Sequence, residues 1–187
     1  MAKKIVALLS SPRQRGNSTL LGETMAAGAK AAGAQVEVFS LHRMNIKPCT
    51  ACDQCQATDD KVCVMQDDMQ KLYKKIREAD GLIYASPVYW FNISAQLKLF
   101  MDRCYALGGP SGHALKGKKM AVALAYADTD PFRSGAVNAL RMFQDAFAYI
   151  GAELIGSVYA TAINPGDILK NKKVMKKALE LGRALVV

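Results

Sequence analysis

The feature that most constrains the fold of this chain is a regular alternation of two kinds of segment. Short apolar or alternating runs, bounded by polar turn residues, predict strands of a largely buried sheet. Between them lie longer segments whose apolar residues recur at helical spacing. The predicted strands cover residues 3–11, 35–41, 81–89, 119–127 and 153–161. This alternation predicts an α/β fold, a three-layer doubly wound sandwich around a five-stranded parallel sheet with strand order 2-1-3-4-5.

Helix start signals and chain length complete this prediction. One helix is predicted to begin with a cap at Asn17 or Ser18, and another with a cap at Asp67 or Asp68. Three further helices are predicted, the last of them rich in lysine. The chain has 187 residues, shows no internal repeat or linker, and is predicted to form a single domain over residues 1–187.

A polar loop, SSPRQRGNSTLL at residues 10–21, follows the first predicted strand and leads into the first helix. Backbone N–H groups and the dipole at a helix N-terminus favour an anion there. Gly16 permits a tight backbone path, and Arg13 or Arg15 adds positive charge. Side-chain donors come from Ser10, Ser11, Asn17, Ser18 and Thr19. The loop is a candidate phosphate site, although its composition alone fits an ordinary polar turn with a helix cap equally well. No G-x-G-x-x-G dinucleotide fingerprint follows the strand.

A second unusual stretch, SPVYWFN at residues 86–92, ends the third predicted strand on the other side of the expected crevice. It contains the only tryptophan of the chain. Aromatic side chains in such a loop can line a flat aromatic ligand while backbone groups bind its polar edge. The alternative is that Tyr89, Trp90 and Phe91 pack under the edge of the sheet. Specialised loops on both sides of one crevice favour the ligand.

Four of the five cysteines gather in one loop at about residues 48–64 with the spacing C-x2-C-x2-C-x7-C. They are Cys49, Cys52, Cys55 and Cys63. Three thiols on a three-residue repeat, with a fourth nearby, can surround an iron–sulfur cube. Three interpretations stay open: a [4Fe–4S] site, which the spacing favours; a metal-free or redox-sensing thiol cluster; and a zinc site, which usually has two separated C-x2-C knuckles. Asp59 and Asp60 indicate an exposed loop, and Cys104, on an apolar helical face, is predicted to be a small core residue.

Charge and hydropathy limit the partners and the location. Lys and Arg number 25 against 16 Asp and Glu, giving a formal net charge of +9 that favours anionic ligands or partners. No recognised nucleic-acid-binding motif accompanies this charge, so a nucleic-acid partner is not expected. No apolar run approaches the roughly 20 residues of a membrane span. With no signal peptide visible and several cysteines, the sequence predicts a reducing, cytoplasmic location without membrane association.

The two loop motifs together carry a family resemblance. SPRQRGNSTLL followed by SPVYWFNISAQLKLFMDR resembles the NADPH-dependent FMN reductase family of flavodoxin-like proteins. The resemblance implies that the first loop binds the phosphate of FMN through Ser10, Arg13, Asn17, Ser18 and Thr19. It implies that the flavin ring is lined by Pro87, Val88, Tyr89, Trp90, Phe91 and Asn92. In the loop after the fourth strand, it singles out Asp128 and Thr129.

The cysteine spacing resembles that of iron–sulfur flavoproteins, a branch of the same family that carries a [4Fe–4S] cluster beside FMN. The resemblance implies an FMN-dependent oxidoreductase that passes single electrons, with NAD(P)H or a ferredoxin-like carrier as electron partner. A cluster-free NAD(P)H-dependent FMN or quinone reductase and a non-enzymatic electron carrier remain alternatives. The family suggests a homodimer or homotetramer, and no side chain is predicted to act as catalytic acid, base or nucleophile. Because the cysteine loop follows the second strand, we expect it beside the phosphate loop.

Overall fold

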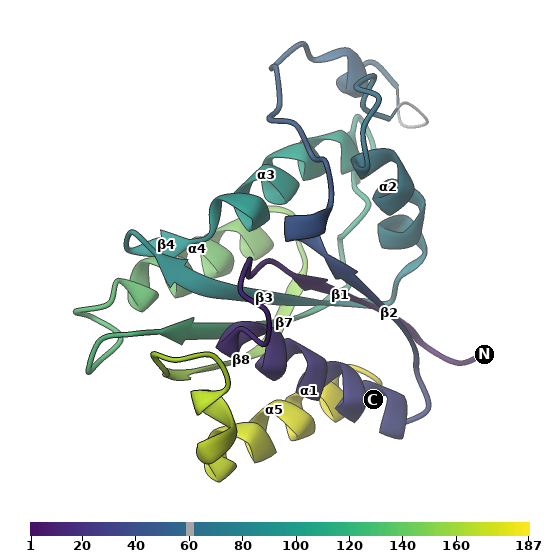
Figure 1. The fold of residues 1–187 in the computed structure, drawn as a ribbon. Coiled ribbons are helices and arrows are strands. Elements are labelled where there is room, and N and C mark those ends of the chain that lie inside the picture. The colour runs from purple at the N-terminus through teal and green to yellow at the C-terminus, as the bar shows by residue number, and fades with distance from the viewer. Residues whose placement is uncertain (59–61) are drawn as a thin grey trace.

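Five parallel strands form the centre of the molecule, as the alternation predicts (Figure 1). The computed structural model describes residues 1–58 and 62–187. The sheet has the predicted order, since its hydrogen-bonded path is β2-β1-β3-β7-β8. Their bounds are Lys4–Leu9 for β1, Gln35–Ser40 for β2, Gly81–Tyr89 for β3, Lys119–Tyr126 for β7 and Glu153–Thr161 for β8. In a parallel sheet of this order, β1 and β3 end beside each other, and ligands bind in the crevice outside those ends.

Helices cover both faces of the sheet and complete the three-layer sandwich (Figure 1). One face carries α1, Asn17–Ala31, and α5, Lys172–Ala184. The other carries α2, Met69–Glu78, α3, Ala95–Arg103, and α4, Ala136–Tyr149. Helices α1 and α5 lie unusually close because Gly28 and Gly182 have no side chain at the contact. A Cβ at either position would collide with the backbone of the opposite helix. Each face has its own apolar core cluster, and the residues of β3 up to Pro87 are all buried.

The structure adds elements that the sequence patterns do not predict. A short strand β4, Asn92–Ile93, pairs antiparallel with the end of β3 and makes the sheet six-stranded. Two-residue strands β5, Gly108–Gly109, and β6, Gly112–His113, form a separate hairpin. Four short 3-10 helices are present in the described residues: η1, Leu41–Arg43, η2, Gln54–Gln56, η3, Cys104–Leu107, and η4, Asp167–Lys170. Elements of two to four residues contain too few positions to show a periodic pattern.

The cap of α2 is one of the two residues predicted, whereas the cap of α1 differs from the prediction. Helix α1 is capped by Gly16, with no side-chain capping hydrogen bond, instead of by Asn17 or Ser18. Asp68 occupies the N-cap of α2, but the backbone N–H of Met69 donates to the carboxylate of Asp67. The side chain of Asn17 does not cap its own helix because it bonds to a distant loop.

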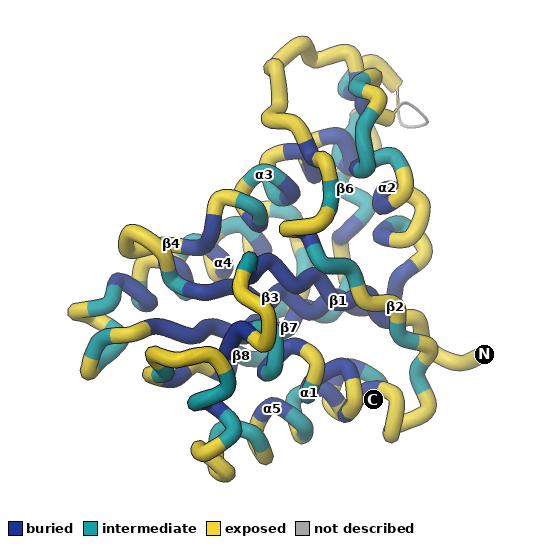
Figure 2. Tube along the Cα trace, in the orientation of Figure 1, coloured by how far each residue is buried: buried dark blue, intermediate teal, exposed yellow. Residues whose placement is uncertain are grey.

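Burial divides the molecule into a closed body and an open loop. Figure 2 shows the central strands as mostly buried, whereas the loop at the top, which contains the cysteines, is largely exposed. Figure 1 shows the same loop extending away from the sheet beyond α2 and α3. None of the helices described here is long and apolar enough to span a bilayer.

Candidate functional site

The loop after β1 is fixed to β3 by a chain of buried hydroxyl groups. Both the backbone N–H and the hydroxyl of Ser10 donate to the carbonyl of Ala85, at 3.0 Å each. The hydroxyl of Ser94 in turn donates to Ser10 Oγ at 2.8 Å. These three residues are fully buried. The hydrogen bonds of Ser10, a predicted phosphate residue, therefore join the loop after β1 to β3 and to Ser94.

The start of α1 is the part of this loop that is prepared for an anion. The backbone N–H groups of Asn17, Ser18 and Thr19 have no acceptor in the described part of the chain. Ser18 is completely buried, and its Oγ is one of only two fully inaccessible side-chain atoms in that part without a hydrogen-bond partner. A buried polar atom without a partner is costly. Four adjacent donors without acceptors are the arrangement that a phosphate group satisfies.

Gly16 and Ser11 keep the backbone of this loop tight. A Cβ at Gly16 would collide with the side chain of Ser11. The Ser11 hydroxyl accepts a hydrogen bond from the backbone N–H of Arg13 at 3.2 Å. Arg15 adopts a left-handed backbone with φ of 55°, which non-glycine residues rarely occupy. A strained loop of this kind is a reason to look for function there.

Asn17 and Arg13 bind a segment that the sequence patterns miss. The amide of Asn17 donates to the carbonyls of Ala162 and Asn164 at 3.2 and 2.9 Å, and its oxygen accepts from the N–H of Ile168. The guanidinium of Arg13 donates to the carbonyl of Ile163 at 3.1 Å. The 162–168 segment therefore closes over the phosphate loop. Its turn-forming sequence NPGD, placed directly after the fifth strand, is the signal that could have pointed to it.

The aromatic stretch forms a tight turn between β3 and β4. Val88 pairs with Ile93 and Tyr89 with Asn92, which leaves Trp90 and Phe91 as the two turn residues. Both have a left-handed backbone, with φ of 46° and 65°. A two-residue hairpin turn of type I′ requires this conformation at both positions and usually has Asn or Gly there. Trp90 is 93% exposed and Phe91 54%. These side chains do not pack under the sheet, so the alternative of an ordinary core cluster is wrong.

The loop after β7 lies opposite this turn. A cavity of about 490 Å³ separates them, and its walls include Val88, Trp90, Phe91, Tyr126, Asp128 and Thr129. The N–H and hydroxyl of Thr129 donate to the carboxylate of Asp128, and these bonds, above all the one from the N–H, lower the pKa of Asp128. Arg133 lies 3.6 Å from that carboxylate and is a further wall of the cavity that sequence reasoning missed.

Hydrogen bonds connect all of these loops at one edge of the sheet. The hydroxyl of Thr161 donates to the carbonyl of Asp128, and the N–H of Ala162 donates to the carbonyl of Tyr126. The 162–168 segment thus joins the loop after β7 to the phosphate loop. The predicted phosphate and ring residues lie at the same edge of the sheet, at the carboxyl ends of β1 and β3. Their contacts with a ligand stay a prediction.

The four loop cysteines divide into two exposed and two buried thiols. Cys49 and Cys52 are exposed, Cys55 and Cys63 are buried, and all are free of disulfides. Asp59 and Asp60, predicted to lie in an exposed loop, are outside the described residues. No three His, Cys, Asp or Glu side chains come together as a metal-binding group in residues 1–58 and 62–187. The donors have the type that iron–sulfur clusters need, but in this conformation the loop is open.

The backbone around Cys52 is strained. Ala51 and Asp53 on either side of it are both left-handed, with φ of 52°. A hydrogen bond from the N–H of Gln54 lowers the pKa of the exposed Cys52 thiol, and a hydrogen bond with the side chain of Thr50 lowers it further. Cys104 lies at the start of η3, where burial raises the pKa of its thiol. As predicted, it belongs to the apolar core.

A buried ion pair anchors the roots of the cysteine loop. The guanidinium of Arg103 contacts the carboxylate of Asp67 at 2.5 and 3.3 Å, and both side chains are fully buried. Arg103 also donates to the carbonyl of Lys47, whose N–H donates to Asp67. Burial raises the pKa of Asp67, but the hydrogen bonds from Arg103, Lys47 and Met69 outweigh it and hold the pKa below its usual value. The pair thus ties both ends of the loop to the end of α3.

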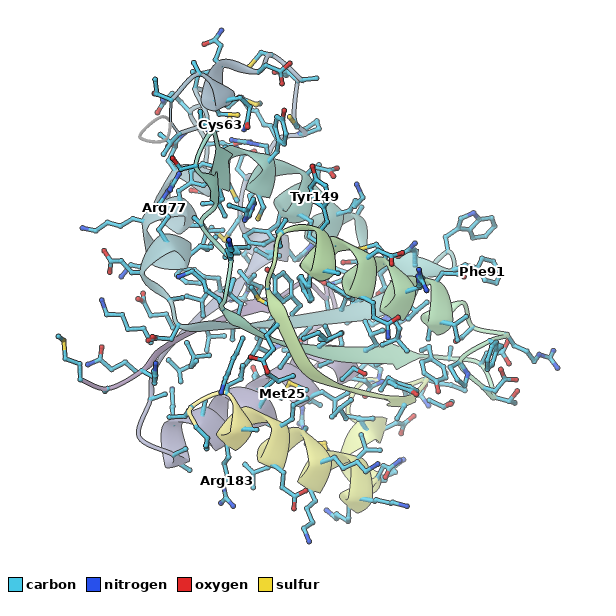
Figure 3. All side chains as sticks on the ribbon, turned by 180° about the vertical axis from the view of Figure 1, so that it is seen from behind. Met25, Cys63, Arg77, Phe91, Tyr149 and Arg183 are labelled. Carbon is cyan, nitrogen blue, oxygen red and sulfur yellow. The ribbon has the colours of Figure 1, made fainter. Side chains whose placement is uncertain are left out.

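This anchoring overturns the expected position of the loop. The side chain of Gln56, within the loop, donates to the carbonyl of Tyr105 at 2.8 Å. The loop therefore packs against η3 and the end of α3 instead of lying beside the phosphate loop. Figure 1 shows the loop extending away from the sheet, and in Figure 3 Cys63 lies far from Phe91 of the aromatic turn. The sequence order of strands predicts where the loop starts, but not the contacts that carry it away.

Comparison with known proteins places the chain among flavoproteins. The chain is 33% identical over 181 residues to an iron–sulfur flavoprotein of Archaeoglobus fulgidus, with 96% of this chain and 77% of the relative aligned. Two further iron–sulfur flavoproteins align over 51% and 60% of their own length. A Bacillus subtilis protein, named as a proposed NAD(P)H-dependent FMN-containing oxidoreductase, is 29% identical over 95% of this chain and 96% of its own length.

The fold is shared with solved structures. The NAD(P)H:quinone oxidoreductase of Methanothermobacter marburgensis superposes with a TM-score of 0.76 over 99% of this chain and 98% of that chain. At 21% identity this similarity shows the flavodoxin-like fold alone. The sequence model of the NADPH-dependent FMN reductases matches residues 3–165. The chain therefore belongs to the NADPH-dependent FMN reductase family of FMN-dependent oxidoreductases.

Proposed function

We propose that this oxidoreductase binds FMN at the carboxyl edge of its sheet, exchanges electrons with NAD(P)H or a protein carrier, and holds a [4Fe–4S] cluster on its four loop cysteines. The proposal combines the family, which supplies the flavin chemistry, with the cysteine pattern, which is particular to this loop. Bound FMN accepts a hydride or releases electrons one or two at a time. The work of this chain is to bind, orient and shield that group.

The observation that supports FMN is the group of donors without acceptors at the start of α1. The N–H groups of residues 17–19 and the buried Oγ of Ser18 would hold the phosphate. Asn17 and Arg13 act indirectly, because they hold the 162–168 segment over the loop. The phosphate is a compact charged group, and donors fixed in advance bind it without further ordering of the chain.

The aromatic turn and the loop after β7 would hold the flavin ring. Trp90 and Phe91 are exposed beside the cavity that the two loops line, and the turn positions them at a cost in backbone strain. Gly135 lies directly against Phe91. A Cβ on this glycine would collide with the Phe91 backbone. The side chain of Asn138 donates to the carbonyl of Phe91 at 3.3 Å. These contacts set the position of the turn relative to α4.

The observation that supports the cluster is the set of four free thiols in one loop with anchored ends. Thiolates are the ligands that iron–sulfur clusters require. The similarity to one relative named an iron–sulfur flavoprotein runs over 96% of this chain. Because the thiols do not converge in this conformation, the proposal requires the exposed half of the loop, with Cys49 and Cys52, to close on the buried half.

The flavin is tested by releasing the ligand and identifying it. Purified protein is denatured by heat, and the released compound is analysed by chromatography and mass spectrometry. We expect FMN at one equivalent per chain. Stoichiometric FAD, or failure to bind FMN on reconstitution, would overturn this part of the proposal.

The cluster is tested by iron and sulfide analysis of protein prepared and reconstituted without oxygen. We expect both elements in the wild-type chain and a loss in each of the variants Cys49→Ser, Cys52→Ser, Cys55→Ser and Cys63→Ser. Cys104→Ser is the matched control, since this thiol lies in the core, and it should retain both elements. If the reconstituted protein holds neither iron nor sulfide, the cluster proposal is overturned. One tightly bound zinc per chain would support the structural-zinc interpretation.

A second candidate function is a cluster-free NAD(P)H-dependent FMN or quinone reductase. The observation that favours it is the open loop, in which the described thiols form no metal-binding group. Steady-state turnover with NAD(P)H and a quinone, compared with reduction by a ferredoxin-like protein, separates the two functions. Fast turnover by a protein without iron would favour the reductase, and reduction only through a protein donor would favour an electron carrier.

We also propose that the chain forms a homodimer or homotetramer and that a protein electron partner is acidic. The support for the acidic partner is the formal net charge of +9. Sedimentation velocity gives the oligomeric state, and a monomer at micromolar concentration would contradict it. Electrostatic association slows as salt rises, so a rate of reduction independent of ionic strength would argue against an acidic partner.

A further inference from the structure

A second chamber lies far from the flavin crevice, between the end of α4 and η3. Its volume is about 230 Å³, and it is lined mainly by apolar and aromatic side chains. Its walls include Tyr84, Met101, Cys104, Tyr105, Phe147 and Tyr149. In Figure 3 Tyr149 lies at the end of α4 toward Cys63 and away from Phe91. The chamber therefore belongs to the opposite end of the helical layer from the aromatic turn.

One buried hydroxyl in this chamber has no partner. Tyr84, in the middle of β3, is 2% exposed, and its hydroxyl makes no hydrogen bond to any residue in the described ranges. The thiol of Cys104 acts electrostatically on this hydroxyl, and both residues line the chamber. The hydroxyl end of Tyr84 therefore lies on the side of the ring where the chamber is. Buried tyrosine hydroxyls usually have a partner, so this one is available to a ligand.

The ring of Tyr84 is held firmly in place. Phe100, Phe143 and Phe147 surround it in edge or tilted contacts, with ring centroids 6.3, 5.7 and 5.2 Å away. Such contacts fix the direction of a side chain that has only two rotatable bonds. Burial, together with the nearby Cys104, raises the pKa of Tyr84, so its hydroxyl remains a donor at neutral pH.

The other polar groups of the chamber are already paired or neutral. His113 Nε2 lies 3.1 Å from the carbonyl oxygen of Cys104, and Nδ1 accepts from the N–H of Leu115 at 3.2 Å. Burial lowers the pKa of His113, which keeps the ring uncharged. Burial raises the pKa of the Cys104 thiol, so it too is neutral. A ligand of this chamber must be uncharged where it is enclosed, with one acceptor for the Tyr84 hydroxyl.

The chamber opens toward a larger and more polar cavity. This outer cavity, of about 490 Å³, shares Tyr105, His113 and Tyr149 with the chamber and adds Gln56 and Lys116. Lys116 has no carboxylate partner among the ion pairs of the described residues. A ligand that is apolar at its inner end can therefore carry a polar or anionic group at its outer end. Gln56 belongs to the cysteine loop, so the outer cavity borders that loop.

We propose that this chamber is a second small-molecule site, which binds a single aromatic ring bearing an oxygen acceptor that faces Tyr84 and a polar or anionic group that faces Lys116. An apolar cavity of about 150 Å³ is enough to bind benzene, so the chamber has room for a substituted ring. The site depends neither on the flavin nor on a cluster. It is distinct in position from the crevice between the aromatic turn and the loop after β7.

The test uses FMN-loaded protein and three probes: acetophenone, ethylbenzene as its counterpart without oxygen, and 4-acetylbenzoate. Binding is followed by calorimetry and by chemical shift changes. Acetophenone should bind more tightly than ethylbenzene. Tyr84→Phe keeps the ring and removes the hydroxyl, and it should raise the Kd of acetophenone about three- to tenfold while leaving that of ethylbenzene unchanged. Lys116→Met should weaken 4-acetylbenzoate alone.

Two controls separate this chamber from other sites. Ala146→Leu fills the chamber from α4 with a good helix former and should abolish binding of all three probes while the fold remains intact by circular dichroism. Trp90→Ala alters the flavin crevice and should leave the three Kd values unchanged. An acetophenone Kd that Tyr84→Phe does not change would overturn the proposal. So would shift changes at the aromatic turn, or the absence of binding because a second copy of the chain covers the chamber.

Discussion

The proposed flavin crevice, which comprises the phosphate loop, the aromatic turn and the loop after β7, and the cysteine loop are built in opposite ways. The crevice is closed by its own hydrogen bonds, with Ser10, Ser94 and Asn17 all joining separate segments. The cysteine loop is held at its roots by the buried pair of Arg103 and Asp67 and at Gln56 by the carbonyl of Tyr105, but its first two thiols are exposed. The first region is ready to receive a ligand in its present shape. On the proposal that it holds a cluster, the second needs that ligand to complete its shape.

This difference has an energetic meaning. A site with donors already in position keeps most of its binding energy, because little ordering remains to be done. A loop that closes around a metal cluster uses part of the binding energy to order itself, so its structure depends on the ligand. Oxygen damage or chelation should therefore change the cysteine loop and leave the flavin crevice intact.

The largest effect is expected from breaking the anchor of the cysteine loop. Arg103→Met leaves the carboxylate of Asp67 buried without its partner, which should lower the free energy of unfolding by about 3–5 kcal/mol. Denaturant titration of flavin-free protein measures this loss. Lys98→Met is the matched control, because Lys98 forms an exposed ion pair with Asp102 on the same helix. The control should cost less than about 1 kcal/mol. Equal losses in both variants would show that the buried pair is no special anchor.

The same pair should make stability depend on pH. Hydrogen bonds hold the pKa of Asp67 below the unfolded-state value of about 3.9. A lowered pKa stabilises the fold above that unfolded value, and the contribution disappears as pH falls through the lower folded value. The stability difference between wild type and Asp67→Asn should thus be constant at neutral pH and shrink below about pH 4. A difference that grows on acidification would contradict the assignment.

The next effect concerns the crevice alone. Ser18→Ala removes a hydroxyl that has no partner in the described chain, so the unfolding free energy of the flavin-free protein should stay the same or rise. If that hydroxyl binds the phosphate, the Kd of FMN should rise about tenfold or more. Thr24→Ala, whose hydroxyl bonds within α1 to the carbonyl of Leu20, is the control and should leave the Kd unchanged. Fluorescence titration of FMN gives both values.

The smallest effect separates strain from ligand contact in the aromatic turn. Trp90→Ala and Trp90→Gly both remove the indole ring. Both should raise the Kd of FMN by a similar factor, about two- to tenfold. Only glycine relieves the left-handed backbone at this position. Trp90→Gly should therefore be more stable to thermal unfolding than Trp90→Ala by about 1 kcal/mol. Equal stabilities would mean that the turn carries no strain.

Much of the frame could be predicted from the sequence, because periodicity reports burial directly. The apolar run at residues 81–89 became β3 with the same bounds, and the helix faces of Leu72 and Phe100 are buried as predicted. Long-range side-chain bonds leave no such pattern. Nothing local shows that Asn17 binds the 162–168 segment, or that Arg103 pairs with Asp67, 36 residues away. Those bonds decide where both candidate sites lie.

The central claim is that the flavin crevice and the cysteine loop are independent sites, and one double variant tests it most directly. Cys49→Ser with Cys52→Ser changes only exposed thiols, so core packing is preserved. FMN, iron and sulfide are measured together on protein prepared without oxygen. The account predicts one FMN per chain, an unchanged Kd for FMN, and loss of iron and sulfide, since separate sites respond independently. Loss of FMN together with the iron would contradict it.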